Sequence, residues 1–408
     1  MPISIACVKI FGKNPHPSKF DFEGNRYYMQ INQNSLCTFL NRSLNTEVHQ
    51  VIEYHQDKLH GGFGEELGGG LGVYRLHGIA TTKVGNQKWS IVLKGASSNK
   101  SGSEELISWD FWKREVLAYQ SGIFDSLPAC NFVAPAFYGI YIPEQNPHER
   151  WICIEDINTE GNNDWSLANL TRAARHLGEF NGAYLAGHPL PQLEWLSKGR
   201  VESWVKIAEP TINNLKEYMK IEYIKRWLTK PDLDRVAKLW SKRHSLLNIL
   251  DSFPRSLCHH DAFTRNLLIN EKNQTVGIDW SILGTGCLGE ELATFVTVSL
   301  QFLDIDVSIA RDFDEIVFNA YFQGLQDTGW IGEKWEARLG YTLSASLFMG
   351  LGSLGFWLPK ITDGRGKEKL SSTINRPFGK IMEQFSYLQS FSLDLGEEAI
   401  QIIRKQLE

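Results

Sequence analysis

The sequence has no excess of positive charge. Its 42 lysines and arginines stand against 47 aspartates and glutamates among 408 residues, giving a formal net charge of -5 at pH 7. Binding to a phosphate backbone or to an anionic membrane surface generally needs clustered basic residues. Neither nucleic acid nor a membrane is therefore an expected partner.

Cysteine is also sparse. The six cysteines are scattered and form no CxxC pair, which argues against a disulfide scaffold and against the commonest zinc-binding spacing. The opening residues, "MPISIACVKIFGKNPHPSKF", lack a basic region ahead of a long apolar run. No signal peptide is expected, and the predicted location is the cytoplasm.

Long uncharged runs are rare. One stretch, "YTLSASLFMGLGSLGFWL" at 341–358, approaches the length needed to cross a bilayer. Its serines, threonine and glycines favour instead a buried core helix in which glycine permits close packing. With 42% hydrophobic and 12% aromatic residues, no internal repeat and no low-complexity tract, the chain is typical of a globular protein of one large or two modest domains.

The first part of the chain changes character several times. Residues 1–45 show no clear period and are predicted to be an appendage, whereas 46–59 have helical spacing. A glycine-rich segment then leads into an alternating run at 73–81, a polar turn "KVGNQK" and a second alternating run "KWSIVLKG". This pattern predicts a β-hairpin beneath a glycine loop. A helix is predicted at 103–122, with Ser103 as its N-cap, followed by the strand-like runs "VAPAFYGIYI" and "RWICIEDI".

The second part is mostly helical. The clearest apolar residues at three-and-four spacing occur in "LANLTRAARHLGEFNGAYLAG" and "PDLDRVAKLWSKRHSLLNILDSF". Strand-like sequence returns only in "RSLCHH", "NLLIN" and "TVGIDW", before helices resume at Glu290. The predicted organisation is the appendage 1–45, a β-rich lobe at 46–157 and a helical lobe at 158–408 that contains an irregular region at 257–281.

The segment "LCHHDAFTRNLLIN" at 257–270 concentrates residues capable of chemistry. A structural zinc site needs four converging ligands, but neighbours in an extended segment point to opposite faces, so the residues of "CHHD" cannot all reach one ion. A hydrolase would need a nucleophile and a separate base, and no GxSxG motif is present. Both alternatives are less favoured than phosphoryl transfer.

Phosphoryl transfer needs an aspartate to accept a hydroxyl proton, an asparagine five residues later and a second aspartate on a following strand. Asp261, Asn266 and Asp279 have this order and spacing. The oxygen atoms of Asn266 and Asp279 are ligands that Mg²⁺ prefers, with phosphate and water completing its coordination.

These segments, "CHHDAFTRNLLI" and "TVGIDWSILGTGCLGEELA", resemble the catalytic and metal-binding segments of the aminoglycoside phosphotransferase and choline kinase-like superfamily. With weaker motifs the resemblance extends from about residue 50 onward. It implies an α+β, two-lobed fold like that of protein kinases: a small antiparallel sheet with one main helix, and a larger, mostly helical lobe. The implied activity is transfer of the γ-phosphoryl group of ATP, with Mg²⁺, to a hydroxyl of a small molecule.

The resemblance also suggests roles for residues of the first lobe. Lys94 in "WSIVLKG" would contact the α/β-phosphates, and Glu115 in "FWKREVLAYQ" would pair with it. Their alternatives are an exposed strand-end lysine and a solvated helix residue. Glycines of "LGGGLGVYRL" would let backbone amides approach phosphate, or would form an ordinary turn. These glycines are Gly69, Gly70 and Gly72.

Further positions follow from the same resemblance. The backbone around Glu155 and Ile157 would hydrogen-bond adenine at the hinge, and His259 would orient the catalytic loop beside Asp261. Two departures are visible: His260 replaces the small residue that many relatives carry and has no assigned role, and Glu291 stands where many carry aspartate.

The acceptor is not determined by the sequence. Aminoglycosides, amino alcohols, sugars and other hydroxylated metabolites are all candidates, and the tryptophans of the helical lobe are expected to pack in its core rather than to form a cation-π box. Two other functions remain open: a catalytically silent, kinase-like nucleotide-binding protein and, less favoured, a metal-dependent hydrolase. The sequence gives no indication of the oligomeric state.

Overall fold

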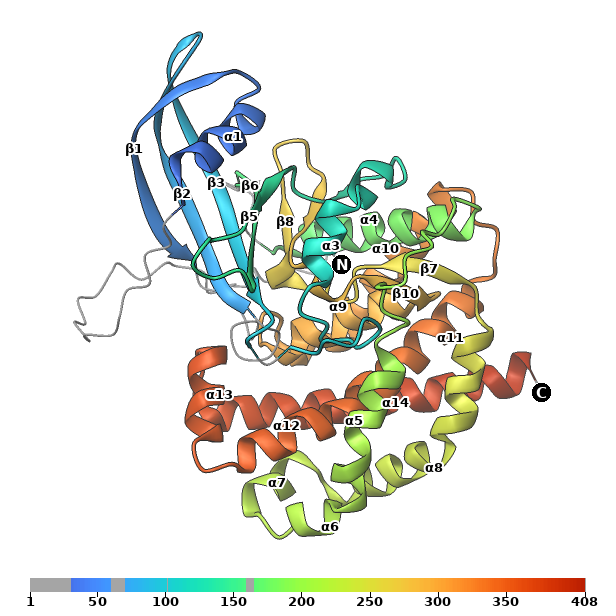
Figure 1. The fold of residues 1–408 in the computed structure, drawn as a ribbon. Coiled ribbons are helices and arrows are strands. Elements are labelled where there is room, and N and C mark those ends of the chain that lie inside the picture. Colours follow the sequence, from blue (N-terminus) through green and yellow to red (C-terminus); the bar gives the residue numbers. More distant parts are fainter. Residues whose placement is uncertain (1–30, 60–69, 101, 159–164, 408) are drawn as a thin grey trace, which may run out of the picture.

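The structure is a computed structural model that describes residues 31–59, 70–100, 102–158 and 165–407. The chain forms a small lobe built on a twisted sheet and a larger helical lobe (Figure 1). The small lobe contains one five-stranded antiparallel sheet in the order β1-β2-β3-β6-β5. Its strands are β1 (Val48–Leu59), β2 (Gly70–Thr82), β3 (Gly85–Ser97), β5 (Phe137–Tyr141) and β6 (Glu149–Glu155).

The predicted hairpin is present as β2 and β3, which pair along their length and turn at Gly85. The helix predicted at 46–59 is wrong, because these residues form the edge strand β1. Register shifts near Val48 and Val51 interrupt the strict alternation of the strand. A bulged edge strand exposed along most of its length shows little of the two-residue period that identifies a strand in sequence.

The helix α1 (Gln33–Ser43) begins after Asn32, whose side chain accepts a hydrogen bond from the Ser35 backbone N–H. Its apolar side chains Leu36, Phe39 and Leu40 are buried in the core of the small sheet. The described part of the predicted appendage therefore packs in the small lobe, and residues 1–30 lie outside the described chain.

The main helix of the small lobe, α3 (Arg114–Gln120), is shorter than the segment 103–122 predicted for it. The preceding residues form turns and a bridge between Ser103 and Phe111. Arg114 is completely buried and donates to the carbonyl oxygens of Leu106, Ser108 and Trp109, and also to those of Trp195 and Ser281 in the large lobe. Because the first three carbonyl groups bond to this side chain, they are not part of a helical ladder.

The large lobe contains the predicted helices at α4 and α8 and a helical C-terminal region. Its longer helices are α4 (Leu167–Leu185), α5 (Val201–Asn213), α8 (Lys230–Ser252), α9 (Glu290–Gln301), α10 (Ala310–Asp327), α11 (Lys334–Ala345), α12 (Ser353–Thr362), α13 (Gly366–Ile374) and α14 (Phe378–Gln406). One continuous core includes most of their apolar faces and the buried tryptophans Trp204, Trp227, Trp280 and Trp357.

Short strands lie between these helices. The three strand-like runs of the second half are β7 (Arg255–Cys258), β8 (Leu267–Ile269) and β9 (Thr275–Gly277). An additional strand, β10 (Gly284–Cys287), pairs with β7, and β4 (Phe132–Val133) pairs with β9. The predicted loop region is thus supported on one side by the β8–β9 hairpin and on the other by the β7–β10 pair.

The long uncharged stretch is a core helix, as the sequence predicts. It lies in a continuous helical segment, Lys334–Thr362, that is long and apolar enough to cross a membrane but whose apolar window is wholly buried within the protein. A π-helical turn, Ser346–Gly352, separates α11 from α12. A side chain at Gly352 or Gly355 would collide with Trp204 or Ala208 of α5, so these glycines permit the close contact of α12 with α5.

Candidate active site

The candidate base Asp261 follows β7, at the start of the loop that leads to β8. Its neighbour His259 is completely buried and joins this loop to the strand before Asp279: His259 Nδ1 accepts from the Asp261 backbone N–H at 3.2 Å, and Nε2 donates to the Ile278 carbonyl at 2.9 Å. Burial lowers the pKa of His259 to about 4, so the ring is neutral at pH 7. A neutral ring that donates with one nitrogen and accepts with the other can set the position of the loop.

Asn266 forms a second link across the loop. Its Nδ2 donates to Asp261 Oδ2 at 2.7 Å and to the Asp261 carbonyl at 3.0 Å, and its own carbonyl accepts from the Ile278 backbone N–H at 2.9 Å. The amide nitrogen therefore faces Asp261, and the side-chain oxygen, which accepts no hydrogen bond from the described residues, can bind another ligand.

Asp279 meets the small lobe through Lys94. Lys94 Nζ lies 2.6 Å from a carboxylate oxygen of Asp279 and 2.6 Å from one of Glu115, whose other oxygen accepts from the Trp280 backbone N–H at 3.1 Å. The expected pairing of Lys94 with Glu115 is thus present. Lys94 is not an exposed lysine at a strand end, and Glu115 is not on a solvated helix face. Residues from β3, α3 and the segment after β9 converge on one ion network.

Burial and charge act against each other in this network. Burial disfavours the charged form of Lys94, but the carboxylates of Asp279 and Glu115 outweigh it and raise the pKa of Lys94. Burial also opposes ionisation of Asp279, and Lys94 reverses that effect, so the pKa of Asp279 is lowered. At Asp261 burial prevails over the attraction of Arg200, and the pKa of Asp261 is raised, which favours its acceptance of a proton.

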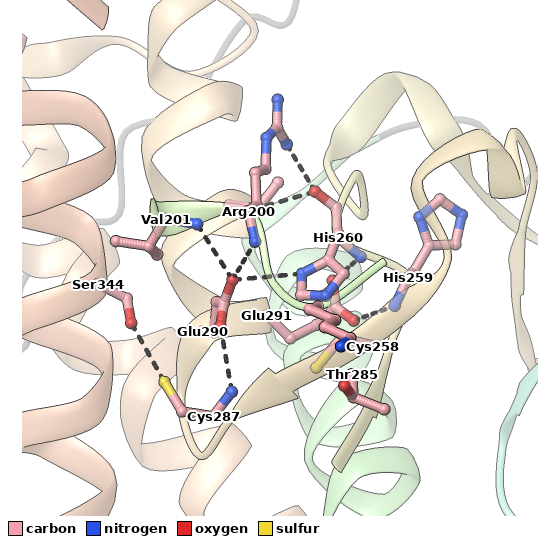
Figure 2. Close-up of polar contacts among 12 residues, drawn as sticks. Arg200, Val201, Cys258, His259, His260, Thr285, Cys287, Glu290, Glu291 and Ser344 are labelled. Atoms are coloured by element: carbon pink, nitrogen blue, oxygen red, sulfur yellow. Dashed lines mark hydrogen bonds and ion pairs between the residues drawn. The ribbon is translucent and has the colours of Figure 1, made fainter. Parts of the chain in front are cut away.

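Two glutamates at the start of α9 hold the buried side of the loop (Figure 2). Glu291 accepts from the backbone N–H groups of His259 at 2.5 Å and His260 at 3.0 Å. Glu290 accepts from the backbone N–H groups of Arg200 and Cys287 at 2.7 and 3.1 Å. The glutamate that replaces aspartate in the sequence motif therefore supports the loop directly, despite its longer side chain.

His260 occupies the left-handed region of backbone conformation, with φ of 63°, and its ring is completely buried. Its Nδ1 lies 3.5 Å from Glu290 Oε1, and burial lowers the pKa of His260 to about 4. The ring points toward Glu290 at the start of α9 (Figure 2).

The remaining predicted positions lie near the junction of the lobes. The backbone N–H of Glu155 donates to the Ala136 carbonyl, and its side chain accepts from the Ala136 N–H; Ile157 is half-buried two residues later. Gly70 and Gly72 flank a register shift at the start of β2, where Gly72 has φ of 114°, a value that favours glycine. Gly69 lies outside the described residues.

The residues present suit a magnesium-bound nucleotide. The side-chain oxygens of Asn266 and Asp279 are hard donors on the two sides of the loop, and the Asp279 side chain is 33% exposed. Within the described chain, no three His, Cys, Asp or Glu side chains gather as a zinc cluster would require. A site with one carboxylate and one amide, completed by phosphate and water, matches the donor set that Mg²⁺ uses in phosphoryl transfer.

Comparison with known proteins places these features in a family context. Residues 155–335 match the model of the phosphotransferase enzyme family, and this range includes Asp261, Asn266 and Asp279. The resemblance to the aminoglycoside phosphotransferase and choline kinase-like superfamily is confirmed. The family match supports a phosphotransferase, and the solved structures below show the fold alone.

Two solved structures share the fold over nearly the whole chain. An aminoglycoside phosphotransferase from Alicyclobacillus acidocaldarius is 11% identical, with a TM-score of 0.52, and the alignment covers 93% of this chain and 99% of that one. A spectinomycin phosphotransferase, in complex with ADP and spectinomycin, is 13% identical, with a TM-score of 0.50 and coverage of 91% and 100%. The search of curated proteins finds no match.

One residue of the site has no signal in the sequence. Arg200 lies 61 positions before Asp261, yet its Nη1 donates to Asp261 Oδ1 at 3.0 Å. Nothing in "SKGRVESW" resembles a catalytic motif. The fully buried Arg114 was likewise not predicted, because its five carbonyl partners are scattered along the chain.

Proposed function

We propose that this protein is an ATP-dependent phosphotransferase that moves the γ-phosphoryl group to a hydroxyl of a small molecule, with Mg²⁺ as cofactor. The observation that carries the proposal is the single network in which Lys94 pairs with both Glu115 and Asp279, while Asp261 and Asn266 share a hydrogen bond on the adjoining loop. These five residues come from both lobes, and the contacts among them support the roles that we propose for them in phosphoryl transfer.

In the proposed reaction the hydroxyl of the acceptor approaches Asp261. Its oxygen forms a bond to the γ-phosphorus, the bond from that phosphorus to the bridging oxygen breaks, and ADP leaves with the bonding electrons. The hydroxyl proton passes to the Asp261 carboxylate, whose raised pKa favours this transfer. When bound, Mg²⁺ would neutralise charge on the phosphate oxygens.

Several residues would act by positioning. Glu115 holds the Lys94 ammonium where it can reach phosphate oxygens, and this contact requires Lys94 to exchange part of its pairing with Asp279. Asn266 would bind the metal through its side-chain oxygen while its amide nitrogen orients Asp261. The backbone around Glu155 and Ile157 would bind adenine, and Gly70 and Gly72 would lie near phosphate.

The test is a screen with ATP carrying a labelled γ-phosphate against a panel of hydroxyl compounds, run on the native protein beside Asp261→Asn. Label should appear on at least one acceptor with the native protein and be almost absent with the variant. Equal transfer by both proteins would show that Asp261 is not the base. A melting temperature raised by Mg²⁺ and ATP, without transfer to any acceptor, would favour the silent nucleotide-binding alternative.

A further inference from the structure

Arg200 connects the helix α5 to the proposed base. The residue immediately precedes α5 and is 7% exposed. Its Nη1 donates to Asp261 Oδ1 at 3.0 Å and to the His260 carbonyl oxygen at 2.5 Å. One guanidinium nitrogen therefore binds both the reactive carboxylate and the backbone directly before it.

Three other contacts hold Arg200 in this position. Its guanidinium carbon lies 5.0 Å from the centre of the Trp204 ring and 4.5 Å from that of Phe348, while its backbone N–H donates to Glu290. Phe348 belongs to the π-helical turn between α11 and α12, a rare conformation that is frequent at functional sites. The aromatic rings stabilise the cation and restrict its movement.

The guanidinium group retains donors that the described residues do not use. Its hydrogen bonds within the described chain are made by Nη1, and Nε is buried without a hydrogen-bond partner. Because Nε is shielded from solvent, the donors that can face an acceptor beside Asp261 are those of Nη2, in a side chain that is 8% exposed.

The same charge affects which acceptors can approach. Asp261 already has a cationic partner in Arg200, and Asp279 has one in Lys94. An ammonium group close to the reacting hydroxyl would find its carboxylate partners occupied and would face Arg200 at short range. An uncharged or anionic group would instead accept hydrogen bonds from Arg200.

We infer that Arg200 is a positioning residue for Asp261 and that it selects acceptors whose reacting end carries no positive charge. The substrate class is then a sugar, a polyol or a hydroxy acid, and not an amino alcohol or an aminoglycoside. This inference rests on the proposed function and narrows it.

The first part of the test uses the native protein and labelled ATP. The acceptor panel contains glucose and inositol as uncharged compounds, glycerate as an anion, and ethanolamine and kanamycin as cations. Transfer to one or more of the first three, with little transfer to the two cations, is the expected result. Preferential phosphorylation of ethanolamine or kanamycin, dependent on Asp261, would overturn the acceptor class while leaving the proposed phosphotransferase intact.

The second part tests positioning with Arg200→Ala. Misplacement of the base should lower kcat by about 100-fold, while the KM for ATP stays unchanged because Arg200 does not contact the Lys94 network. Added guanidinium ion at millimolar concentration should restore part of kcat by occupying the space between Trp204 and Phe348. The matched control is Arg243→Ala, which removes an arginine stacked on Trp240 at 3.8 Å, away from the loop. It should keep native kcat and show no rescue.

The outcomes distinguish a failure of the role of Arg200 from a failure of the proposed phosphotransferase function. If Arg200→Ala has the native kcat, the positioning role is contradicted. It is also contradicted if Arg243→Ala loses kcat as well and guanidinium ion restores kcat equally in both variants. If Arg200→Ala does not fold, as judged by its melting transition, Arg200→Lys decides: reduced kcat with an unchanged melting temperature supports the inference, and native kcat overturns it. If no acceptor is labelled and Asp261→Asn has the same residual ATP hydrolysis as the native protein, the proposed function fails and the inference fails with it.

Discussion

The two sides of the loop that carries Asp261 are stabilised differently. One side, named the cleft side after the proposed nucleotide site, carries Asp261 and Asp279, which keep partial exposure and are paired with the side chains Arg200 and Lys94. On the buried side, Glu290 and Glu291 are desolvated and accept mainly from backbone N–H groups. The chemistry on the cleft side therefore depends on ion pairs between side chains. The shape of the loop depends on buried carboxylates that accept the hydrogen bonds that backbone N–H groups would otherwise make to water.

This difference predicts two kinds of variant. A substitution on the cleft side should lower the rate first, because the paired side chains there belong to the proposed reaction. A substitution on the buried side should lower the stability first, because unsatisfied backbone donors cannot recover hydrogen bonds to water.

The largest expected effect is that of Asp261→Asn. Losing the proton acceptor should lower the rate of phosphoryl transfer by about 10³-fold, within the usual range for general base catalysis. The melting temperature should fall less than in Glu291→Ala, since asparagine has the same shape and its one side-chain oxygen can still accept from either Arg200 or Asn266. Single-turnover rates with labelled ATP and thermal melts followed by circular dichroism provide the two measurements. A large fall in melting temperature with little change in rate would show that Asp261 serves the stability of the fold and not the reaction.

Glu291→Ala tests the buried side. Removing the acceptor of the His259 and His260 backbone N–H groups should lower the free energy of unfolding by about 2–4 kcal/mol. Glu291→Gln is the matched control, because its carbonyl oxygen can still accept and because burial already raises the pKa of Glu291 to about 8. It should cost clearly less in urea unfolding. Equal stability of the alanine variant and the native protein would contradict the supporting role.

Lys94→Met tests the cleft side where the lobes meet. Loss of the ammonium group should weaken binding of ATP with Mg²⁺ by about 1.5–3 kcal/mol, the range for hydrogen bonds to charged groups. Isothermal titration calorimetry measures the change. Lys88→Met, in the exposed part of the same strand, is the control and should bind as the native protein does. Equal weakening by both variants would show that the effect does not come from the site.

The smallest expected effect is a change in the pH dependence of the free energy of unfolding in the variant His260→Asn. With a pKa of about 4 in the folded protein and 6.5 as its ordinary value, His260 binds fewer protons folded than unfolded between these pH values. Its contribution to stability is therefore complete above pH 6.5 and is lost as the pH falls toward 4, at up to about 1.4 kcal/mol per pH unit. Asparagine tolerates the positive φ and does not titrate.

The variant should therefore show a shallower fall in the free energy of unfolding between pH 6.5 and 4 than the native protein, measured by urea unfolding at several pH values. His259 has a similarly lowered pKa and remains in both proteins, so part of the slope should persist. Parallel pH profiles would mean that His260 is already protonated, or solvated, in the folded state.

The sequence predicted those parts of the fold that depend on local pattern. The β2–β3 hairpin, α4, α8 and the short strands around Asp261 all have clear periods or turn residues. The strand β1 was mistaken for a helix because its bulges disturb the alternation. The start of α3 was placed too early because Arg114 binds the preceding carbonyl groups through tertiary contacts that no local pattern reveals.

The candidate site divides in the same way. Asp261, Asn266 and Asp279 could be proposed from their spacing, and Lys94 and Glu115 from a resemblance; the structure brings all five together, and their roles remain predictions. Arg200 could not be found from the sequence because its contact with Asp261 depends on how α5 packs against the π-helical turn and α12. The sequence around an arginine at the start of a helix gives no indication of such packing.

The central claim is that Asn266 and Asp279 bind one metal ion at the phosphates while Asp261 faces the acceptor. Crystals grown with Mn²⁺ and a non-hydrolysable ATP analogue test it most directly through the anomalous signal of manganese. A peak is expected within bonding distance of the Asn266 side-chain oxygen and an Asp279 carboxylate oxygen, next to the analogue's phosphates. Bound analogue with the manganese peak at other residues, or with Asp261 turned away from the γ-phosphate, would contradict it.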